Sequence, residues 1–462
     1  MADSGWSGTR LRRRDLLASG AALLAVAAAP VTYASKRRAP NIIVILCDDL
    51  GYGDIEPTGG RLIKTPNINK MAAQGTLFTN YYAAANLCTP SRAGLLTGRY
   101  PIRTGLGYQV ILQNDERGLP LSEVTIPEAL KPAGYATALF GKWHLGHRGP
   151  AWPPTNHGFD RFFGIPYSHD MSPLSLFDVD AKGKVQQEPV VYSELQQRFY
   201  AEAERFIDAN ADRPFFVELA LSAPHLPEYP HPPFQKQSSA GAYGDVVTEI
   251  DDLVGRLLAK LKALKLEHDT LVVFTSDNGP WFEGATGGLR QRKGGGGYDG
   301  GYRVPMIAYW PGVVPAGRTT DAITSAIDFL PTFCSLAGMP PPPGVALDGR
   351  DVSALMTGRA SVSPHDELLL FDNEDVVGVR TQRWAFIDSD YYRGRLFPTD
   401  AKYPQLYDMM VDPSQSYSFA DRQPEVLADM RARLARARAT FAPFKSATIP
   451  AAFARPAPAL QD

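Results

Sequence analysis

The segment NIIVILCDDLGYGD, residues 41–54, sets the main expectation for the fold. After Asn41, its first residues are apolar without interruption, and several of them are β-branched. Such a run is typical of a strand that is buried on both faces, as in a parallel sheet covered by helices. Asp48 and Asp49 follow at the carboxyl end of this strand, where open α/β sheets place their ligand sites. The segment therefore predicts a parallel sheet with a polar site at its edge.

Three further segments repeat this pattern along the chain. Each is an apolar run that ends in polar side chains: YATALFGKWHLG (135–146), PFFVELALSAPH (214–225) and TLVVFTSDNG (270–279). Residues 245–264 carry apolar side chains at helical spacing, which predicts one long amphipathic helix before the last of these strands. Alternating strands and helices predict an α/β fold with a large, doubly wound, mixed but mostly parallel sheet. Four such strands would assemble one site from distant segments.

The sequence changes in character near residue 360. Short candidate strands follow at 367–371, 376–380 and 384–387, and a polar helix is expected over about 424–439. This order predicts a small antiparallel α+β domain. We therefore expect the following organisation: an N-terminal signal at 1–34, a large domain at 35–359, a small C-terminal domain at 360–449, and a loose tail rich in alanine and proline at 450–462.

The composition is that of an ordinary globular protein. Of its 462 residues, 44% are hydrophobic and 21% charged, and the net charge of −2 gives no reason to expect nucleic acid as a partner. The three cysteines, Cys47, Cys88 and Cys334, are too few for a disulfide framework. We expect Cys47 to be buried in the first strand and Cys334 to lie in the core of a helix near 328–337.

The first 34 residues resemble an export signal. An arginine cluster precedes a short apolar run at 16–29, and small residues lie near Ala34. Arg13 and Arg14, followed by Asp-Leu-Leu, resemble a twin-arginine signal, which predicts an exported protein, periplasmic or secreted. An ordinary secretory signal is the main alternative, and an uncleaved anchor is a weaker one. No other stretch is long and apolar enough to predict a membrane span after signal removal.

A second decisive segment is LCTPSRAGLLTGRY, residues 87–100. Thr89 is a candidate helix N-cap and Pro90 suits the first helical position, so Cys88 would lie at the amino end of a helix, where negative charge is favoured. Arg92, one turn on, can point the same way. By itself this cysteine could equally be a packed residue or a thiol of lowered pKa.

The Cys88-Thr89-Pro90-Ser91-Arg92 motif resembles the signature of type I sulfatases, within the alkaline phosphatase superfamily. Other segments match that family in order: NIIVILCDDLGYGD, GKWHLG, APHLP, FTSDNG and LYDMMVDP. The resemblance implies that a formylglycine-generating system oxidises Cys88 to 3-oxoalanine (formylglycine), an aldehyde. It covers nearly the whole chain after residue 41, and implies a sulfuric ester hydrolase.

The resemblance also implies a metal site. Asp48, Asp49, Asp277 and Asn278 offer only oxygen atoms, which suit a hard divalent ion such as calcium or magnesium. The family's usual ion is calcium, so we expect Ca²⁺, with Mg²⁺ as the alternative, bound by these four residues and by residue 88. A single aspartate pair at a strand end would more often be a turn or a cap, but two sets after two buried strands favour metal.

The remaining roles come from the same resemblance. Arg92 would hold the hydrated aldehyde, Lys142 would bind sulfate and His144 would handle a proton. Because they are two residues apart, Lys142 and His144 would face the same side of an extended chain. His225 and Lys293 would bind sulfate and protonate the leaving oxygen. The remaining histidines match no motif and are expected to be structural or exposed: His147, His157, His169, His231, His268 and His365.

One segment departs from the family pattern. In KGGGGYDGGYRVP, four glycines separate Lys293 from Tyr298, one more than is usual, and Asp299 stands where glutamate is common. The extra glycine indicates a loop insertion or a shifted lysine, so the register of Lys293 is the least secure of these assignments. The glycine run also predicts a mobile loop at the mouth of the site.

Three functions remain open from the sequence. The first is hydrolysis of an aryl or carbohydrate sulfate monoester, and similarity to the arylsulfatase A and galactosamine-6-sulfatase branch favours sugar sulfates. The second is hydrolysis of phosphonate monoesters or phosphodiesters by the same nucleophile. The third is a catalytically silent binder of sulfated glycans, which would require unmodified Cys88. We expect specificity to depend on the loops at 167–191 and 229–243, which carry no recognisable code.

Overall fold

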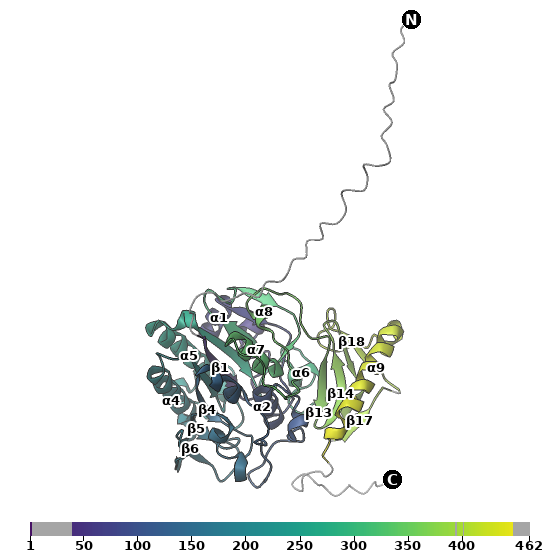
Figure 1. Cartoon of the computed structure of the whole chain (residues 1–462). Coiled ribbons are helices and arrows are strands. Elements are labelled where there is room, and N and C mark those ends of the chain that lie inside the picture. Colours follow the sequence, from purple (N-terminus) through teal and green to yellow (C-terminus); the bar gives the residue numbers. More distant parts are fainter. Residues whose placement is uncertain (2–38, 393–394, 401, 447–462) are drawn as a thin grey trace, which may run out of the picture. The chain divides into compact units, whose positions relative to one another are not determined.

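A computed structural model of the chain describes Met1 and residues 39–392, 395–400 and 402–446 (Figure 1). The described residues from 39 onward belong to one compact unit. The export signal expected at 1–34, Met1 apart, and the tail expected at 450–462 lie outside the described residues.

The large sheet confirms the predicted α/β architecture. Its strand order is β11-β2-β10-β9-β1-β8-β4-β5-β6-β7, and the four strands predicted from apolar runs, β9, β1, β8 and β4, are neighbours that pair in parallel. The added strands β10, β6 and β7 run antiparallel to their partners. The strands are β1 (Asn41–Cys47), β2 (Thr76–Phe78), β4 (Ala136–Lys142), β5 (Arg161–Ile165), β6 (Ser175–Val179), β7 (Val185–Pro189), β8 (Phe215–Ala220), β9 (Thr270–Ser276), β10 (Met306–Tyr309) and β11 (Arg318–Thr320).

Helices cover both faces of this sheet, which explains the uninterrupted apolar runs. Alternate residues of β1 face opposite sides: Ile43 packs in one core with α1 (Pro66–Ala73), α4 (Leu195–Ala209) and α5 (Gly241–Ala263). Val44 packs in the other core with α2 (Cys88–Thr97), α3 (Ile126–Leu130) and α7 (Phe329–Leu336). Figure 1 shows α4 and α5 side by side, and the two helices are in contact. The helix predicted at 245–264 is α5, which begins four residues earlier.

A second, antiparallel sheet follows, as predicted for the C-terminal region. Its order is β13-β14-β15-β18, and α9 packs on β14. These elements are β13 (Leu368–Asp372), β14 (Asp375–Arg380), β15 (Trp384–Ile387), β18 (Gln405–Asp408) and α9 (Pro424–Phe441). The smaller elements are β3 (Tyr81–Tyr82), β12 (Thr324–Ser325), α6 (Asp299–Tyr302), α8 (Ser353–Met356), β16 (Ser389–Tyr392) and β17 (Arg395–Pro398). The domain limits at 359 and 449 remain predictions.

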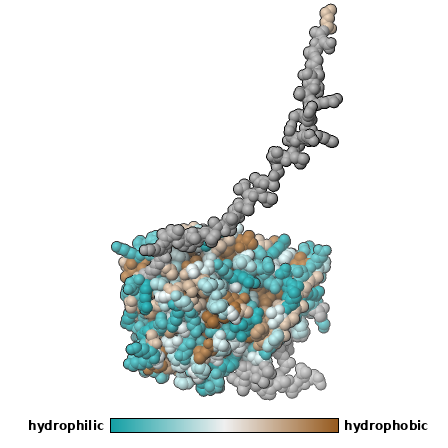
Figure 2. All heavy atoms as spheres, viewed as in Figure 1, coloured by the Kyte–Doolittle hydropathy of each residue, from teal (hydrophilic) through white to brown (hydrophobic). Residues whose placement is uncertain are grey.

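The surface and the cysteines agree with the composition. On the face seen in Figure 2, hydrophobic residues lie in small patches among hydrophilic ones. Within the described part of the chain, no helix combines the length and apolarity needed to cross a membrane. Cys47 is buried in β1 and Cys334 in α7, as expected, and all three cysteines are free.

Candidate active site

The carboxyl ends of β1, β8 and β9 meet at one edge of the large sheet, and backbone hydrogen bonds join the loops that follow them. The amide of Asp48 donates to the carbonyl of Ala223 after β8, at 3.0 Å. The amide of Asp277, after β9, donates to the carbonyl of Cys47 at 3.0 Å. Asp49 donates its own amide to Oδ1 of Asp277 at 3.2 Å. The parallel pairing of three strands thus brings together carboxylates that are more than 200 residues apart in the sequence.

Cys88 lies at the amino end of α2, as predicted, but the predicted cap is wrong. The helix begins at Cys88 with Leu87 as its N-cap, because the amide of Ser91 already bonds to the carbonyl of Leu87 at 3.0 Å. Thr89 is therefore inside the first turn and Pro90 is the third helical residue, where its missing N–H costs no hydrogen bond. The Thr89 hydroxyl instead donates to the carbonyl of His144 at 2.9 Å and ties the helix to the loop after β4.

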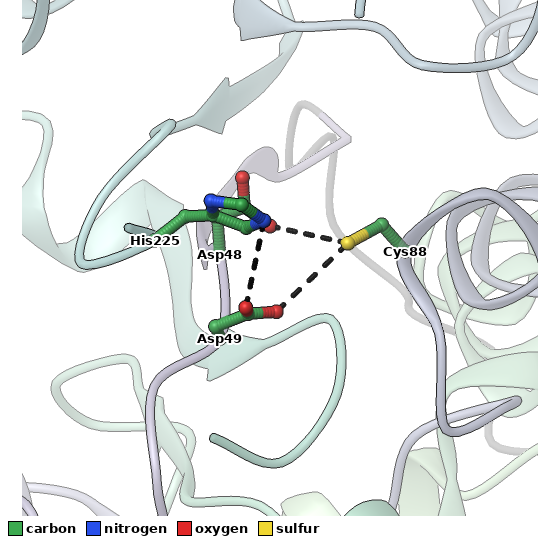
Figure 3. A group of neighbouring side chains, drawn as sticks. All are labelled: Asp48, Asp49, Cys88 and His225. Atoms are coloured by element: carbon green, nitrogen blue, oxygen red, sulfur yellow. Dashed lines mark hydrogen bonds and ion pairs between the residues drawn. The ribbon is translucent and has the colours of Figure 1, made fainter. Parts of the chain in front are cut away.

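Cys88 points at the aspartate pair (Figure 3). Its Sγ lies 3.5 Å from Oδ1 of Asp48 and 3.9 Å from Oδ1 of Asp49. His225 approaches from the loop after β8, with Nε2 3.6 Å from Oδ2 of Asp49. One ligand atom from each of these four residues lies within 4.8 Å of the others. Burial raises the pKa of the Cys88 thiol, although Lys142 and Lys293 lower it, so this environment does not favour a thiolate of lowered pKa.

Three cations balance the three carboxylates of the site. Lys142 lies 2.6 Å from Oδ2 of Asp48, and Lys293 lies 2.7 Å from Oδ2 of Asp49. Arg92 donates Nε to Oδ2 of Asp277 at 2.9 Å. Since a buried charge without a partner costs several kcal/mol, this pairing lets six charges share one enclosed space. The sequence left the register of Lys293 open, and the structure brings Lys293 to the aspartate pair.

These pairs set the protonation of the carboxyl groups. Burial would raise the pKa of Asp48, but Lys142 and the other cations hold it well below its usual range. Burial raises the pKa of Asp277 to about 6, and the negative charge of Asp48 adds to this rise against the effect of Arg92. Burial disfavours the charged form of Lys142 as well, yet Asp48 outweighs it and raises the pKa of that ammonium group. The site therefore contains charged groups that depend on one another.

His144 is held as a neutral base. Its Nε2 lies 2.9 Å from the carbonyl of Ile111, so Nε2 carries the proton, and the buried Nδ1 has no hydrogen-bond partner. Burial, with the nearby charge of Lys142, holds the pKa of His144 well below its usual value. The residue has φ of 58°, so the extended conformation expected from Lys142 to His144 is wrong. The backbone turns at His144, so the two side chains take different directions: Lys142 bonds to Asp48, whereas His144 lines the pocket.

The donor atoms fit a hard divalent ion. Asp48, Asp49 and Asp277 supply buried carboxylate oxygens, and Oδ1 of Asn278 is buried without a hydrogen-bond partner. The side-chain Nδ2 of Asn278 donates to Oδ1 of Asp49 at 2.7 Å, so half a turn of this amide group would bring the orphaned Oδ1 to the aspartate pair. An all-oxygen set of this kind suits calcium or magnesium. The group of potential ligand atoms that lie within 4.8 Å of one another includes His225 and not Asp277, whose carboxylate is engaged by Arg92 and the amide of Asp49.

A pocket of about 600 Å³ opens above these groups. Cys88, His144, His225 and Lys293 line it, together with a mostly apolar rim that includes Trp281. Of the two loops expected to set specificity, 167–191 contributes Ser168, Asp170 and Met171, whereas residues 229–243 do not line this pocket. A larger hollow of about 710 Å³ lies by α1 and α5 and holds none of the site residues.

Sequence reasoning missed Trp281 in this wall. His169, expected to be structural or exposed, does not line the pocket: it is buried with its ring 5.6 Å from that of His225, and its Nε2 lies 2.9 Å from the carbonyl of Pro227. Trp281 follows directly on the predicted metal segment, yet a tryptophan in a loop carries no motif. Only the folded position of these loops reveals that they face the site.

Comparison with known proteins places the chain among the sulfatases. The Sulfatase family model matches residues 40–339, and the model described as N-sulphoglucosamine sulphohydrolase, C-terminal, matches residues 297–440. Arylsulfatase A of Homo sapiens is 37% identical over 467 aligned positions, covering 90% of this chain and 89% of that protein. N-acetylgalactosamine-6-sulfatase of Sus scrofa is 40% identical, covering 74% of this chain and 71% of that protein.

A solved structure agrees with these matches. A sulfatase from Pseudoalteromonas sp. superimposes with a TM-score of 0.81 and 28% identity, covering 89% of this chain and 92% of that one. The large mixed sheet and the smaller antiparallel sheet thus occur together in this structural neighbour.

Proposed function

The chain belongs to the sulfatase family and is a sulfuric ester hydrolase, and we propose that it hydrolyses an aryl or carbohydrate sulfate monoester with a formylglycine derived from Cys88. One observation carries the proposal. The Cys88 side chain lies 3.5 Å from Asp48, at the floor of a pocket where three carboxylates and three cations converge. A binding protein would not require so many buried charges around one thiol, because each is costly to desolvate.

Modification of residue 88 would supply the nucleophile. Hydrated formylglycine offers one hydroxyl that attacks sulfur and displaces the alcohol, and a second whose deprotonation restores the carbonyl and expels sulfate. The oxidation of Cys88 to formylglycine requires a formylglycine-generating system as a partner of the chain. Arg92, already anchored at Asp277, would orient the hydroxyl groups of residue 88. The unpartnered Nδ1 of His144 is a base suited to accept the proton of the second hydroxyl.

A calcium ion is the proposed metal, with magnesium as the alternative. Asp48, Asp49, Asp277 and Asn278 would hold it together with residue 88. The ion would lower the pKa of the attacking hydroxyl and draw charge from a sulfate oxygen. Lys142 and Lys293 now bond to Asp48 and Asp49, and their ammonium groups would be available to sulfate oxygens once an ion neutralises those carboxylates.

His225 and Lys293 lie nearest the open side of the site and would act on the leaving group. Both line the pocket, and both approach Oδ2 of Asp49, at 3.6 Å and 2.7 Å. Either side chain can donate a proton to the departing oxygen when it is charged. We infer that one of them binds sulfate while the other protonates the alcohol.

The substrate class and the location follow from weaker observations. The names of the similar proteins include an arylsulfatase and an N-acetylgalactosamine-6-sulfatase, which supports aryl or sugar sulfates as substrates here. Arg13 and Arg14 support export by the twin-arginine route to the periplasm or the exterior.

The test combines mass spectrometry with sulfate release. We expect the peptide that contains Cys88, from protein purified from its own host, to carry the aldehyde or its hydrate. Cys88→Ala should abolish sulfate release. Cys334→Ala, which removes another buried free thiol far along the chain, should retain it.

Two results would overturn the proposal. An intact thiol at residue 88, in a host that modifies other such motifs, would favour the silent binder. Turnover of a phosphodiester much faster than that of a matched sulfate ester would favour the phosphonate monoester and phosphodiester hydrolase instead.

A further inference from the structure

Two large aromatic side chains are exposed beside the site. Trp281 is 38% exposed and Phe282 is 74% exposed. They follow Pro280 directly after the segment Asp277–Gly279, on the loop that leaves β9. Their rings pack edge to face with centroids 4.6 Å apart. Exposed aromatic surface is unfavourable in water, and adjoining aromatic rings at the mouth of a pocket are typical of a ligand-binding surface.

The neighbouring segment anchors this aromatic pair in position. Arg292 donates Nη1 to the carbonyl of Trp281 and to that of Phe282, the latter at 2.7 Å. The amide of Lys293 donates to the carbonyl of Pro280 at 3.0 Å. Two successive residues of the loop before the glycine run thus hold the aromatic loop, so its rings are presented in a defined place.

Trp281 also lies next to the chemistry. Its ring centroid is 6.0 Å from Nζ of Lys293, whose ammonium group bonds to Asp49. Trp281 lines the pocket of about 600 Å³ together with Leu226, Pro227 and Met171. Charged groups therefore occupy the floor of the pocket and apolar groups its rim. A sulfate bound on the floor would place the organic part of the ester against Trp281.

The charged side chains around the rim are of both signs. Among the described residues that line the pocket, Lys293 is the one lysine and Asp170 is the one carboxylate. The histidines His144 and His225 line it as well. Glu228, next to Pro227, and Glu283, next to Phe282, add two acids whose charges interact. Burial, and then the neighbouring Glu283, raise the pKa of Glu228 to about 7. Arg292 brings a cation to the same loop, with Nη1 at the carbonyls of Trp281 and Phe282, so the rim carries charges of both signs.

We propose that Trp281, extended by Phe282, is a substrate-binding subsite that stacks on a flat, uncharged face of the alcohol part of the ester. The ligand is thus a sulfate ester whose organic part has either an aryl ring or the C–H face of a sugar. This inference rests on the proposed sulfatase activity and specifies its substrate class.

The experiment compares three esters in the full-length protein after the aldehyde at residue 88 has been verified. The substrates are 4-nitrophenyl sulfate, a hexose 6-sulfate and ethyl sulfate, which has no flat face. The variants are Trp281→Ala, Trp281→Phe and Phe282→Ala. Tyr417→Ala is the matched control, since Tyr417 is 75% exposed and does not line the pocket. Sulfate release gives kcat and KM for each pair.

We expect Trp281→Ala to lower kcat/KM about tenfold more for a stacking ester than for ethyl sulfate, mainly through KM, because one aromatic contact contributes a factor of this order. Trp281→Phe should restore most of the loss, Phe282→Ala should cause a smaller one, and Tyr417→Ala should change nothing. If the loss is larger for 4-nitrophenyl sulfate, Trp281 stacks on an aryl ring; if it is larger for the hexose 6-sulfate, Trp281 stacks on the C–H face of a sugar.

The outcomes separate the inference from the proposed function. If the unaltered, modified protein releases sulfate from none of these esters, the proposed function fails. If it is active but Trp281→Ala affects all three esters equally, or none of them, only the subsite is wrong.

Discussion

Two buried polar clusters in this molecule differ in how completely their atoms are paired. In the seam between α6 and the small sheet, the Tyr82 hydroxyl lies 3.0 Å from Asp299 and accepts Nε of Arg380 at 2.7 Å. The Tyr302 hydroxyl accepts the amide of Phe371 at 2.9 Å and donates to the carbonyl of the same residue. At the edge of the large sheet, by contrast, Oδ1 of Asn278 and Nδ1 of His144 have no partner.

The difference shows which cluster maintains the fold and which is prepared for a ligand. Buried polar atoms in native proteins are nearly always paired, so each orphaned atom requires a physical explanation. In the seam the hydroxyls of Tyr82 and Tyr302 need none, because both are paired. The seam's orphaned atom is Nε2 of Gln415, a residue whose Oε1 accepts the amide of Asp299 at 3.0 Å. In the site, the orphaned oxygen fits a metal ion and the orphaned nitrogen fits a proton. Removing a group from the site should therefore cost activity, whereas removing one from the seam should cost stability.

Among the substitutions that compare the two clusters, the largest effect is expected for Lys142→Met. This change removes the cation 2.6 Å from Asp48, in a pair that is fully buried. Loss of one preorganised charge that stabilises the transition state should lower kcat about 10²- to 10³-fold. Steady-state sulfate release measures this. Lys260→Met is the matched control, because Lys260 pairs with Asp208 at 2.7 Å on the surface and its loss should leave kcat unchanged. Equal effects of the two changes would contradict the comparison.

Glu218→Gln tests an orphaned atom that is not part of the site. Glu218 lies in β8, and its Oε2 is buried without a partner. Burial raises the pKa of Glu218 from 4.5 to about 7, although Arg92 lowers it. Above pH 4.5 the unfolded chain loses a proton that the folded protein retains until about pH 7, so this group destabilises the fold as pH rises through that range, by up to about 3 kcal/mol.

The substitution should therefore raise the free energy of unfolding at pH 8 and have little effect below pH 4.5. Chemical denaturation at both pH values measures this, and Glu116→Gln, on an exposed pair, should change neither. Activity should be retained. A large loss of kcat would mean that Glu218 supports the site through Arg92 and that orphaned atoms alone do not distinguish the two clusters.

Metal removal should distinguish the site from the seam more directly, because only the site is proposed to bind an ion. Chelation should stop turnover, and calcium at a hundred times its Kd should stabilise the folded protein by about 2.7 kcal/mol, because the ion binds only the folded state. Thermal unfolding gives a readout independent of activity. In Asn278→Ala, which lacks the orphaned oxygen, calcium should raise the melting temperature less than in the unaltered protein. An unchanged response would remove Asn278 from the proposed ligands.

Tyr302→Phe should have the smallest effect, and only on stability. It deletes the hydroxyl that pairs with both backbone groups of Phe371 and leaves a buried amide unsatisfied, at a cost of about 1–3 kcal/mol. Denaturant unfolding should show the loss while kcat stays constant. Tyr403→Phe, at a residue that is 69% exposed, should be neutral. A fall in kcat for Tyr302→Phe would show that the seam is coupled to the site.

Much of the architecture could be predicted because it depends on local patterns. Apolar runs long enough to be buried on both faces identified β1, β4, β8 and β9, and helical spacing identified α5. The prediction was wrong where a side chain bonds to a residue that is distant in the sequence. Thr89 has the side chain of an N-cap, but its hydroxyl bonds to His144 instead, so the helix starts two residues earlier than its cap chemistry suggests.

The sequence by itself determined the strands, the order of the polar segments and the identity of the charged groups, because hydrophobic periodicity and motif spacing are local properties of the chain. Tertiary structure alone decided which charges pair, how Lys293 reaches Asp49 despite the added glycine, and why Trp281 faces the pocket. It also decided the backbone turns at Asp49 and His144, which both have positive φ. These features depend on contacts between segments up to 244 residues apart, for which the local sequence carries no signal.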